Sequence, residues 1–247
     1  MLGSLRYLLL QVRKPGDTMA PHEVHGFAKH LRCPESNIQI HDLISGQPTR
    51  SQLDDVDAVL LGGSGDFSVV TGGPWLEPAL ETMRELHELS KPTFASCWGF
   101  QAFSLALGGS VVTDIQRAEV GSFDLRLTQI GLEDPVFSPM GETFCAQLGH
   151  QDIVERLPEG AHCLASSDRV ANQAFCFPGK PIYGTQFHPE LDLSTLLDRL
   201  RTYPAYIESI TGLEYDQFVK RCCRESKATE GLLERFARHV FRHLDHA

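Results

Sequence analysis

Continuous apolar segments alternate with amphipathic ones through the first hundred residues. Buried strands are expected where apolar residues run together, as in the AVLL of residues 58–61. On this basis we expect strands at residues 5–12, 37–43, 57–63 and 92–96, and helices at residues 21–31 and 75–89. Such alternation is typical of βαβ units, so the sequence predicts an α/β fold with a mostly parallel central sheet flanked by helices.

The pattern changes after Gly108 and Gly109. Short strands separated by turn residues are expected at residues 110–112, 123–129, 143–148, 162–167, 172–177 and 181–187. Beyond about Leu191, apolar residues recur at helical spacing, at Leu193, Leu196, Leu197, Leu200, Leu232, Leu233, Phe236 and Val240. These C-terminal helices either cover the core or contact a second copy or another protein, and spacing alone leaves both open.

The charge balance excludes some classes of partner. The 247 residues include 22 Lys and Arg against 32 Asp and Glu, a formal net charge of −10. Phosphate neutralisation needs a basic surface, so we expect no nucleic-acid partner.

No apolar segment approaches the ~20 residues that cross a bilayer, so we expect no membrane partner. Residues 5–12 lack a small-residue cleavage site and are better interpreted as a strand than as a signal sequence.

The cysteines indicate a reducing compartment and no metal site. Their number is odd and no CxxC pair occurs; they are Cys33, Cys97, Cys145, Cys163, Cys176, Cys222 and Cys223. Scattered thiols of this kind are expected to be reduced, which predicts a cytoplasmic protein. The sequence offers no dense cluster of His, Cys and Asp, so we expect neither a metal nor a cofactor.

Cys97 differs from the other cysteines in its setting. It lies between the predicted strand that ends at Ser96 and a predicted helix at residues 98–107, with the small residues Ala95 and Gly99 around it. A strand-to-helix turn of this form lifts a nucleophile clear of the sheet. The helix N-terminus favours a thiolate and provides N–H donors for an oxyanion. Cys97 is therefore a candidate nucleophile, with a structural buried thiol as the alternative.

The segment PIYGTQFHPEL at residues 181–191 supplies a candidate base. His188 follows a predicted strand and precedes Pro189, which places it in the loop at the end of that strand. Glu190 can accept a hydrogen bond from the imidazole and fix its tautomer. A His and a Glu so close in sequence are often an ordinary surface pair, and only the elbow cysteine upstream makes the catalytic interpretation attractive.

A glycine pair, Gly62 and Gly63, ends the predicted strand at residues 57–63. Without side chains, the backbone at this point can approach a ligand closely. The pair could supply a second oxyanion donor, form a phosphate-binding loop or make a plain tight turn. A P-loop requires a lysine that this segment does not contain, which argues against phosphate binding.

Together these segments resemble the class I (triad type) glutamine amidotransferases, in particular the glutaminase domain of GMP synthase and its free-standing relatives. The family's elbow, Gly-aliphatic-Cys-x-Gly-x-Gln, is similar to ASCWGFQ at residues 95–101, and its Gly-x-Gln-Phe-His-Pro-Glu motif is matched at residues 184–190. The separation of Cys97 from His188, 188 − 97 = 91 residues, also agrees. Further markers agree at residues 119–121 and 147–152.

The resemblance implies a flavodoxin-like fold and a complete set of site residues. The implied roles are Cys97 as nucleophile, His188 as general acid and base, Glu190 as orienting carboxylate, Gly63 and Trp98 as oxyanion donors, and Gly62, Gln101 and His150 as substrate-binding residues. The chain departs from the family at Ala95 and Ser96, where the family has glycine and an aliphatic residue. These departures leave the nucleophile in place but put the rate and the specificity in doubt.

The resemblance covers roughly residues 5–190. We therefore expect a catalytic domain at residues 1–190 and a helical extension at residues 191–247 that packs on the same domain. Glutamine or a γ-glutamyl compound is the implied substrate, and the ammonia would go to a synthetase partner or into solvent. Because no synthetase domain is present, a γ-glutamyl peptidase or hydrolase with the same triad is an alternative, and a non-catalytic binding module is another. A homodimer also stays open.

Overall fold

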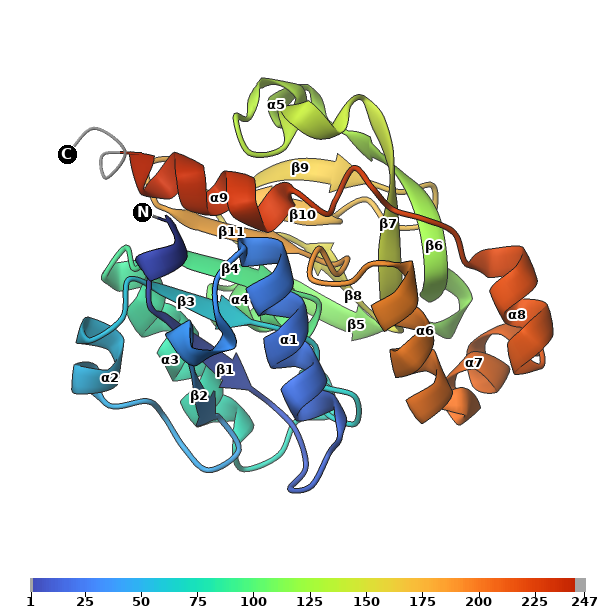
Figure 1. Cartoon of the computed structure of the whole chain (residues 1–247), viewed down its shortest axis with the longest axis horizontal. Coiled ribbons are helices and arrows are strands. Elements are labelled where there is room, and N and C mark those ends of the chain that lie inside the picture. Colours follow the sequence, from blue (N-terminus) through green and yellow to red (C-terminus); the bar gives the residue numbers. More distant parts are fainter. Residues whose placement is uncertain (1, 243–247) are drawn as a thin grey trace.

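The structure is a computed structural model that describes residues 2–242. Within this range, nine strands form one sheet in the order β2-β1-β3-β4-β11-β10-β9-β6-β7, and β5 pairs with β8 separately (Figure 1). The strands are β1 Tyr7–Gln11, β2 Ile38–Asp42, β3 Ala58–Leu61, β4 Thr93–Ser96, β5 Ser110–Thr113, β6 Glu119–Leu127, β7 Thr143–His150, β8 Asp152–Arg156, β9 His162–Ser166, β10 Ala174–Cys176 and β11 Ile182–Thr185. The helices are α1 Met19–Leu31, α2 Arg50–Asp54, α3 Leu76–Glu88, α4 Trp98–Ala106, α5 Gln129–Glu133, α6 Leu193–Thr202, α7 Pro204–Thr211, α8 Tyr215–Cys222 and α9 Leu232–Val240.

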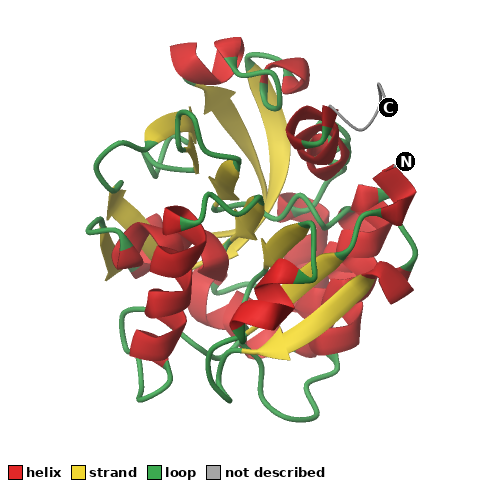
Figure 2. Cartoon of the chain, turned by 90° about the vertical axis from the view of Figure 1, so that its left-hand side faces the viewer, coloured by secondary structure: helices red, strands yellow, loops and turns green. Residues whose placement is uncertain are grey.

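Most strands of the large sheet point the same way. Strands β2, β1, β3, β4 and β11 pair in parallel. Beyond β11 each strand is antiparallel to its neighbour, so β10 and β6 run opposite to the rest while β9 and β7 run with them. The predicted α/β fold with a mostly parallel sheet between helices is confirmed, as Figure 2 also shows.

Side chains of the strands alternate between two cores. In β1, Tyr7 and Leu9 belong to the core that α1 and α9 cover, whereas Leu8 and Leu10 belong to the core that α3 and α4 cover. Successive side chains of a strand point to opposite faces, so an unbroken apolar run fits only a strand buried on both sides. Figure 1 shows α1 and α9 in front of the sheet, with α3 and α4 behind it.

The strand register brings three chain segments together at one edge of the sheet. Leu61 of β3 pairs with Ala95 of β4, and Ser96 of β4 pairs with Thr185 of β11. All three strands run in parallel, so the segments that follow them leave the sheet side by side. Ligand sites of open α/β sheets lie at this carboxyl edge.

Some element boundaries differ from those expected. The strand expected at residues 123–129 is β6, which begins earlier and ends at Leu127. It ends there because Thr128 caps α5, its side chain accepting a hydrogen bond from Gly131 N at 3.0 Å.

The apolar stripes predicted near the C-terminus lie on helices α6 and α9. In α9, Leu232, Leu233 and Phe236 are fully buried, and in α6 the buried leucines are Leu196 and Leu200. None of the described helices is long and apolar enough to cross a membrane. The expected boundary at residue 190 falls just before α6, which packs against α1.

Candidate active site

Cys97 occupies a strained turn between β4 and α4. Its backbone has φ 50° and ψ −104°, a region that L-residues rarely adopt. The Cys97 N–H donates to the Thr185 carbonyl at 2.7 Å, which ties the turn to β11. Cys97 is the N-cap residue of α4, so its side chain leaves the chain at the N-terminus of that helix. This is the elbow predicted from the sequence.

Small residues allow the elbow to pack against the neighbouring strand. A Cβ atom at Gly99 would lie 2.5 Å from the Leu61 Cβ and 3.2 Å from the Ala95 Cβ, so no larger residue fits at position 99. The Gly99 N–H also donates to the Gly62 carbonyl at 3.2 Å. The glycine pair and the elbow are thereby fixed to each other.

His188 and Glu190 face Cys97 from the loop that follows β11. The His188 Nδ1 lies 2.6 Å from Glu190 Oε1, and the imidazole is close enough to Cys97 for the sulfur to raise the pKa of His188. The exposed fractions of Cys97, His188 and Glu190 are 8%, 3% and 0%. The three side chains that the motifs single out therefore meet in one nearly enclosed site, although 91 residues (188 − 97) separate the first two.

The electrostatics of the pair favour a charged imidazole. Burial by itself lowers the pKa of His188, but the Glu190 carboxylate and the Cys97 sulfur outweigh it and raise that pKa to about 9. Burial likewise raises the pKa of Glu190, yet the attraction of His188 and their hydrogen bond lower it to about 2. Glu190 is therefore ionised near neutral pH and accepts a hydrogen bond from Nδ1–H, which leaves Nε2 as the nitrogen that can exchange a proton with the sulfur.

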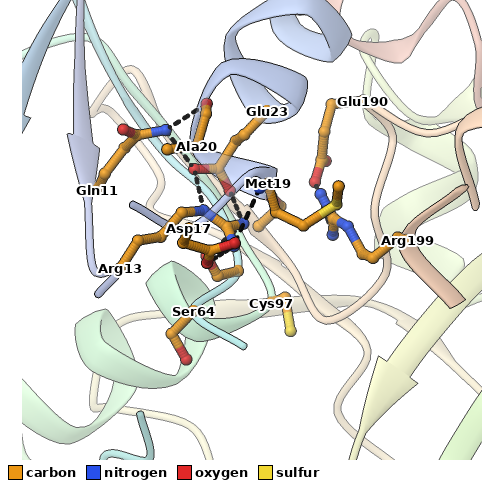
Figure 3. A network of polar contacts seen from close by, with 12 residues as sticks. Gln11, Arg13, Asp17, Met19, Ala20, Glu23, Ser64, Cys97, Glu190 and Arg199 are labelled. Atoms are coloured by element: carbon orange, nitrogen blue, oxygen red, sulfur yellow. Dashed lines mark hydrogen bonds and ion pairs between the residues drawn. The ribbon is translucent and has the colours of Figure 1, made fainter. Parts of the chain in front are cut away.

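A buried ion pair between Arg13 and Glu23 holds Gly62 and Gly63 in place. The Arg13 guanidinium donates to Glu23 from Nε at 3.2 Å and from Nη2 at 3.0 Å, and Nη2 also donates to the Gly63 carbonyl at 3.2 Å. A Cβ at Gly62 would lie 2.1 Å from Glu23 Oε1, so this position has no room for a side chain. The network, which includes Gln11, is drawn in Figure 3. It holds the backbone at residues 62–63 rigid beside the elbow.

Gly63 lies directly against the imidazole. A Cβ atom there would be 2.9 Å from His188 Cε1. Only glycine lets the backbone come this close to the imidazole.

Gln101 and His150, the expected substrate-binding residues, are engaged in hydrogen bonds within the protein. Gln101 Nε2 donates to the Asp152 carbonyl at 2.8 Å and to Gln186 Oε1 at 3.2 Å. His150 Nδ1 lies 3.1 Å from the same carbonyl, and its Nε2 lies 3.1 Å from Glu119 Oε2. Both side chains are buried, and together they connect α4 to the end of β7.

The open side of the site lies next to β7. Cys97 Sγ is 4.0 Å from the Gly149 carbonyl, and a Cβ atom built at Gly149 would meet nothing within 4 Å. This position borders free space beside the nucleophile. Gly149 is therefore the residue of β7 whose carbonyl lies beside the sulfur.

Arg13, Glu23, Gly149 and Arg199 were not identified from the sequence. The Arg199 Nη1 lies 3.2 Å from His188 Nδ1 and is contributed by α6, outside the motifs. A charged residue on a helix is usually solvated, so its sequence position carried no signal. For Arg13 and Glu23, the charges within otherwise apolar, buried segments were the available signal.

Within the part of the chain that the structure describes, no group of three His, Cys, Asp or Glu side chains could hold a metal ion. The chemistry available to the site is that of an activated thiol with an acid–base partner and backbone N–H donors. Burial raises the pKa of most other cysteines, Cys33, Cys145, Cys163, Cys176 and Cys223, so those thiols are less reactive.

Comparison with known proteins agrees with this geometry. The family model of glutamine amidotransferase class-I matches residues 28–200. The chain belongs to this family. It is 28% identical over 170 residues to a glutamine-hydrolysing GMP synthase subunit of Methanothermobacter thermautotrophicus, a match that covers 69% of this chain and 82% of that one. It is also 34% identical over 123 residues to the corresponding subunit of Methanocaldococcus jannaschii, a match that covers 50% of this chain and 63% of that one, just under two thirds of its length.

Solved amidotransferase structures share the fold. A glutamine amidotransferase from Thermotoga maritima superposes with a TM-score of 0.76 at 20% identity, over 96% of this chain and 98% of that one. Another glutamine amidotransferase, from Methylobacillus flagellatus, superposes with a TM-score of 0.70 at 17% identity, over 95% of this chain and 94% of that one. At this level of identity the likeness concerns the fold, which extends over the C-terminal helices as well.

Proposed function

We propose that this protein hydrolyses the side-chain amide of glutamine through a thioester on Cys97. The observation that carries the proposal is the contact among Cys97, His188 and Glu190 at a strained helix N-terminus. Membership of the glutamine amidotransferase family supports glutamine as the substrate. The residues matched by the family model, 28–200, include all three side chains.

In the first half of the reaction the Cys97 thiolate attacks the amide carbon. A C–S bond forms, and the N–H groups of Gly63 and Trp98 stabilise the oxyanion, an effect worth roughly 3–4 kcal/mol per donor. His188 Nε2 then gives its proton to the amide nitrogen, the C–N bond breaks and ammonia leaves. Glu190 stabilises the imidazolium throughout.

In the second half, neutral His188 takes a proton from water, and the resulting hydroxide attacks the thioester. The C–S bond breaks and the Cys97 thiolate leaves beside the imidazolium, which restores the starting pair; glutamate departs after its new carboxyl group loses its proton to solvent. The enclosed position of the three side chains limits the access of bulk water to the intermediate.

We further propose that the ammonia passes to a synthetase partner in the cytoplasm. The relatives are named as one lettered subunit of GMP synthase, and such a name implies a second subunit. The seven cysteines are free, as expected of a reducing compartment. We propose residues 1–190 as the catalytic domain and residues 191–247 as an extension packed on it.

The test measures two reactions of the purified protein separately: release of ammonia from glutamine, and release of cysteinylglycine from glutathione, a γ-glutamyl peptide. We expect glutamate and ammonia from glutamine, and loss of at least about 10³-fold in rate with Cys97→Ser or His188→Gln. Addition of an ATP-dependent synthetase should increase the rate if the partner is needed. Preferential cleavage of glutathione would refute glutamine as the substrate, and full activity of Cys97→Ser would refute the nucleophile.

A further inference from the structure

Helix α6 brings a largely buried guanidinium to the back of the site. The Arg199 side chain is 13% exposed, and its Nη1 lies 3.2 Å from His188 Nδ1 and 3.9 Å from Glu190 Oε1. Figure 3 shows Arg199 beside the Glu190 carboxylate. Since Nδ1 carries a proton and donates it in the hydrogen bond to Glu190, that nitrogen cannot also accept a hydrogen bond from Arg199. Its contact with the imidazole is therefore one of charge.

The neighbours of Arg199 among the described residues do not use all of its hydrogen-bond donors. Among the described residues, its Nε and Nη2 atoms are buried without a hydrogen-bond partner, and so is Glu190 Oε2. Arg13 is different, because its guanidinium binds Glu23, Asp17 and the Gly63 carbonyl. A buried cation costs free energy unless it is compensated. The negative charge of the Glu190 carboxylate is close enough to compensate the positive charge of Arg199.

The neighbouring contacts of α6 hold Arg199 in this position. Asp192 caps the helix by accepting from the Thr195 N–H at 2.8 Å. Tyr203 follows Arg199 by four residues, so it lies on the same face, and its hydroxyl donates to Asp17 at 3.0 Å. The site-facing side of α6 is thus tied down before and after Arg199.

We propose that Arg199 is a positioning residue of the active site: it orients the ionised Glu190 carboxylate and opposes the accumulation of positive charge on His188. The inference rests on the proposed function. Charged or titratable groups that face His188 are Glu190, Cys97 and Arg199, and Arg199 is the positive one. Arg199 is also one of the charged groups that act on His22 of α1, together with Asp198, Arg13 and Glu190.

The consequence concerns proton transfer to ammonia. Glu190 and Cys97 favour the imidazolium so strongly that His188 would hold its proton too tightly to release it quickly to the leaving amide nitrogen. The nearby guanidinium works against this and makes His188 a better acid. Burial, and the charges of Arg199 and Arg13, lower the pKa of His22, which is therefore a neutral neighbour.

The experiment measures the pH dependence of Cys97 alkylation by iodoacetamide, with the labelled peptide quantified by mass spectrometry and Cys97→Ala as the blank. As the pH rises, the alkylation rate changes twice. The first inflection marks formation of the thiolate–imidazolium pair, and the second marks loss of the imidazolium proton. In Arg199→Gln and Arg199→Met the second inflection should move up by about one pH unit. In Arg199→Lys it should stay within a few tenths of a unit. Arg201→Gln, an exposed residue of the same helix that pairs with Asp198, is the matched control and should match wild type.

Unchanged inflections in both neutral variants, or an Arg199→Lys profile that moves as far as that of Arg199→Gln, would overturn the proposal. Near-ultraviolet circular dichroism checks that each variant is folded, and the methionine variant keeps the apolar stem should the glutamine variant fail to fold. Glutamine hydrolysis is measured separately. Wild-type protein that does not hydrolyse glutamine would refute the proposed function, whereas the alkylation profiles decide the role of Arg199 without any substrate.

Discussion

The backbone at Cys97 stores strain that its side chain does not relieve. A non-glycine residue with φ 50° costs of the order of 1–2 kcal/mol relative to one in an allowed region. The cost is sustained by the contacts around it, in particular the bond from the Cys97 N–H to Thr185. Strain of this kind at a cleft is typical of functional positions.

We therefore expect Cys97→Gly to be more stable than Cys97→Ala. Both variants remove the thiol, but only glycine adopts a positive φ without a clash, so the difference in the free energy of unfolding should be about 1 kcal/mol. Urea denaturation monitored by fluorescence measures it. An alanine variant that is as stable as the glycine variant would show that the turn is relaxed.

The stability of the protein should depend on pH through His188. Its pKa is raised from the ordinary 6.5 to about 9, so the pair stabilises the folded state fully below about pH 6.5, and this stabilisation is lost as the pH rises through 9. The carboxylate of Glu190, with a pKa lowered to about 2, stays ionised over that range. In Glu190→Gln the pKa of His188 should fall, because burial then acts without the opposing charge.

The measurement is the free energy of unfolding of wild type and of Glu190→Gln at pH 6 and at pH 9.5. We expect the advantage of the wild type to shrink by roughly 1–3 kcal/mol between the two values. Groups elsewhere titrate alike in both proteins and cancel. A difference in the free energy of unfolding between wild type and Glu190→Gln that does not change with pH would contradict the ion pair.

At the scale of single residues, the motifs predicted Cys97, His188 and Glu190 because their types and spacing follow directly from the chemistry. Arg199 could not be predicted in this way. Its role depends on the contact of α6 with His188 in the loop that follows β11, and sequence spacing does not encode a contact between elements.

Among the elements, α6 links the C-terminal helices to the site. Its N-cap, Asp192, both accepts from Thr195 N and pairs with Lys29 of α1. These contacts outweigh the effect of burial and hold the pKa of Asp192 well below its usual range. The cap therefore fixes the start of the helix that carries Arg199.

Replacement of this cap should weaken the helix. We expect Asp192→Ala to lower the free energy of unfolding by about 1–2 kcal/mol, since it removes both the cap and the ion pair. Asp198→Ala, an exposed residue of the same helix paired with Arg201, is the control and should change stability by less than about 0.5 kcal/mol. Equal effects of the two substitutions in thermal or urea denaturation would argue against a specific role of the cap.

Element types were easier to predict than element ends. Strands β1 and β3 were expected because runs of apolar residues, YLLL at residues 7–10 and AVLL at residues 58–61, make up most of them, and that pattern depends on the sequence alone. The end of β6 was wrong by two residues, since the pattern of FDLRLTQ does not show that Thr128 prefers to cap α5. The antiparallel half of the sheet was expected only as short strands, because their order in space is set by long-range pairing.

For the whole molecule, the core does not stop at residue 190. Phe236 of α9 packs edge-on against Phe94 of β4 at a ring distance of 5.3 Å and against Tyr183 of β11 at 5.8 Å. The helix thus covers the two strands that lead into the site. The expected division into a catalytic domain and an extension stays a prediction, but the two parts share one apolar core.

The fold should therefore depend on α9. We expect Phe236→Ala to lower the free energy of unfolding by about 3–5 kcal/mol, because it leaves a cavity next to Phe94 and Tyr183. Leu132→Ala, at a residue that is 38% exposed, should cost less than about 1 kcal/mol. Urea denaturation compares them. A Phe236 variant as stable as the wild type would show that α9 is dispensable.

The unusual backbone angle at position 97 has a consequence for descendants of this protein. A side chain is kept at this position only for the chemistry of the sulfur, because glycine would adopt the same backbone angles without strain. A lineage that kept the architecture but abandoned the reaction would gain by exchanging that cysteine for glycine. The residue at position 97 should thus separate active enzymes from homologues that have lost the activity more clearly than overall sequence identity does.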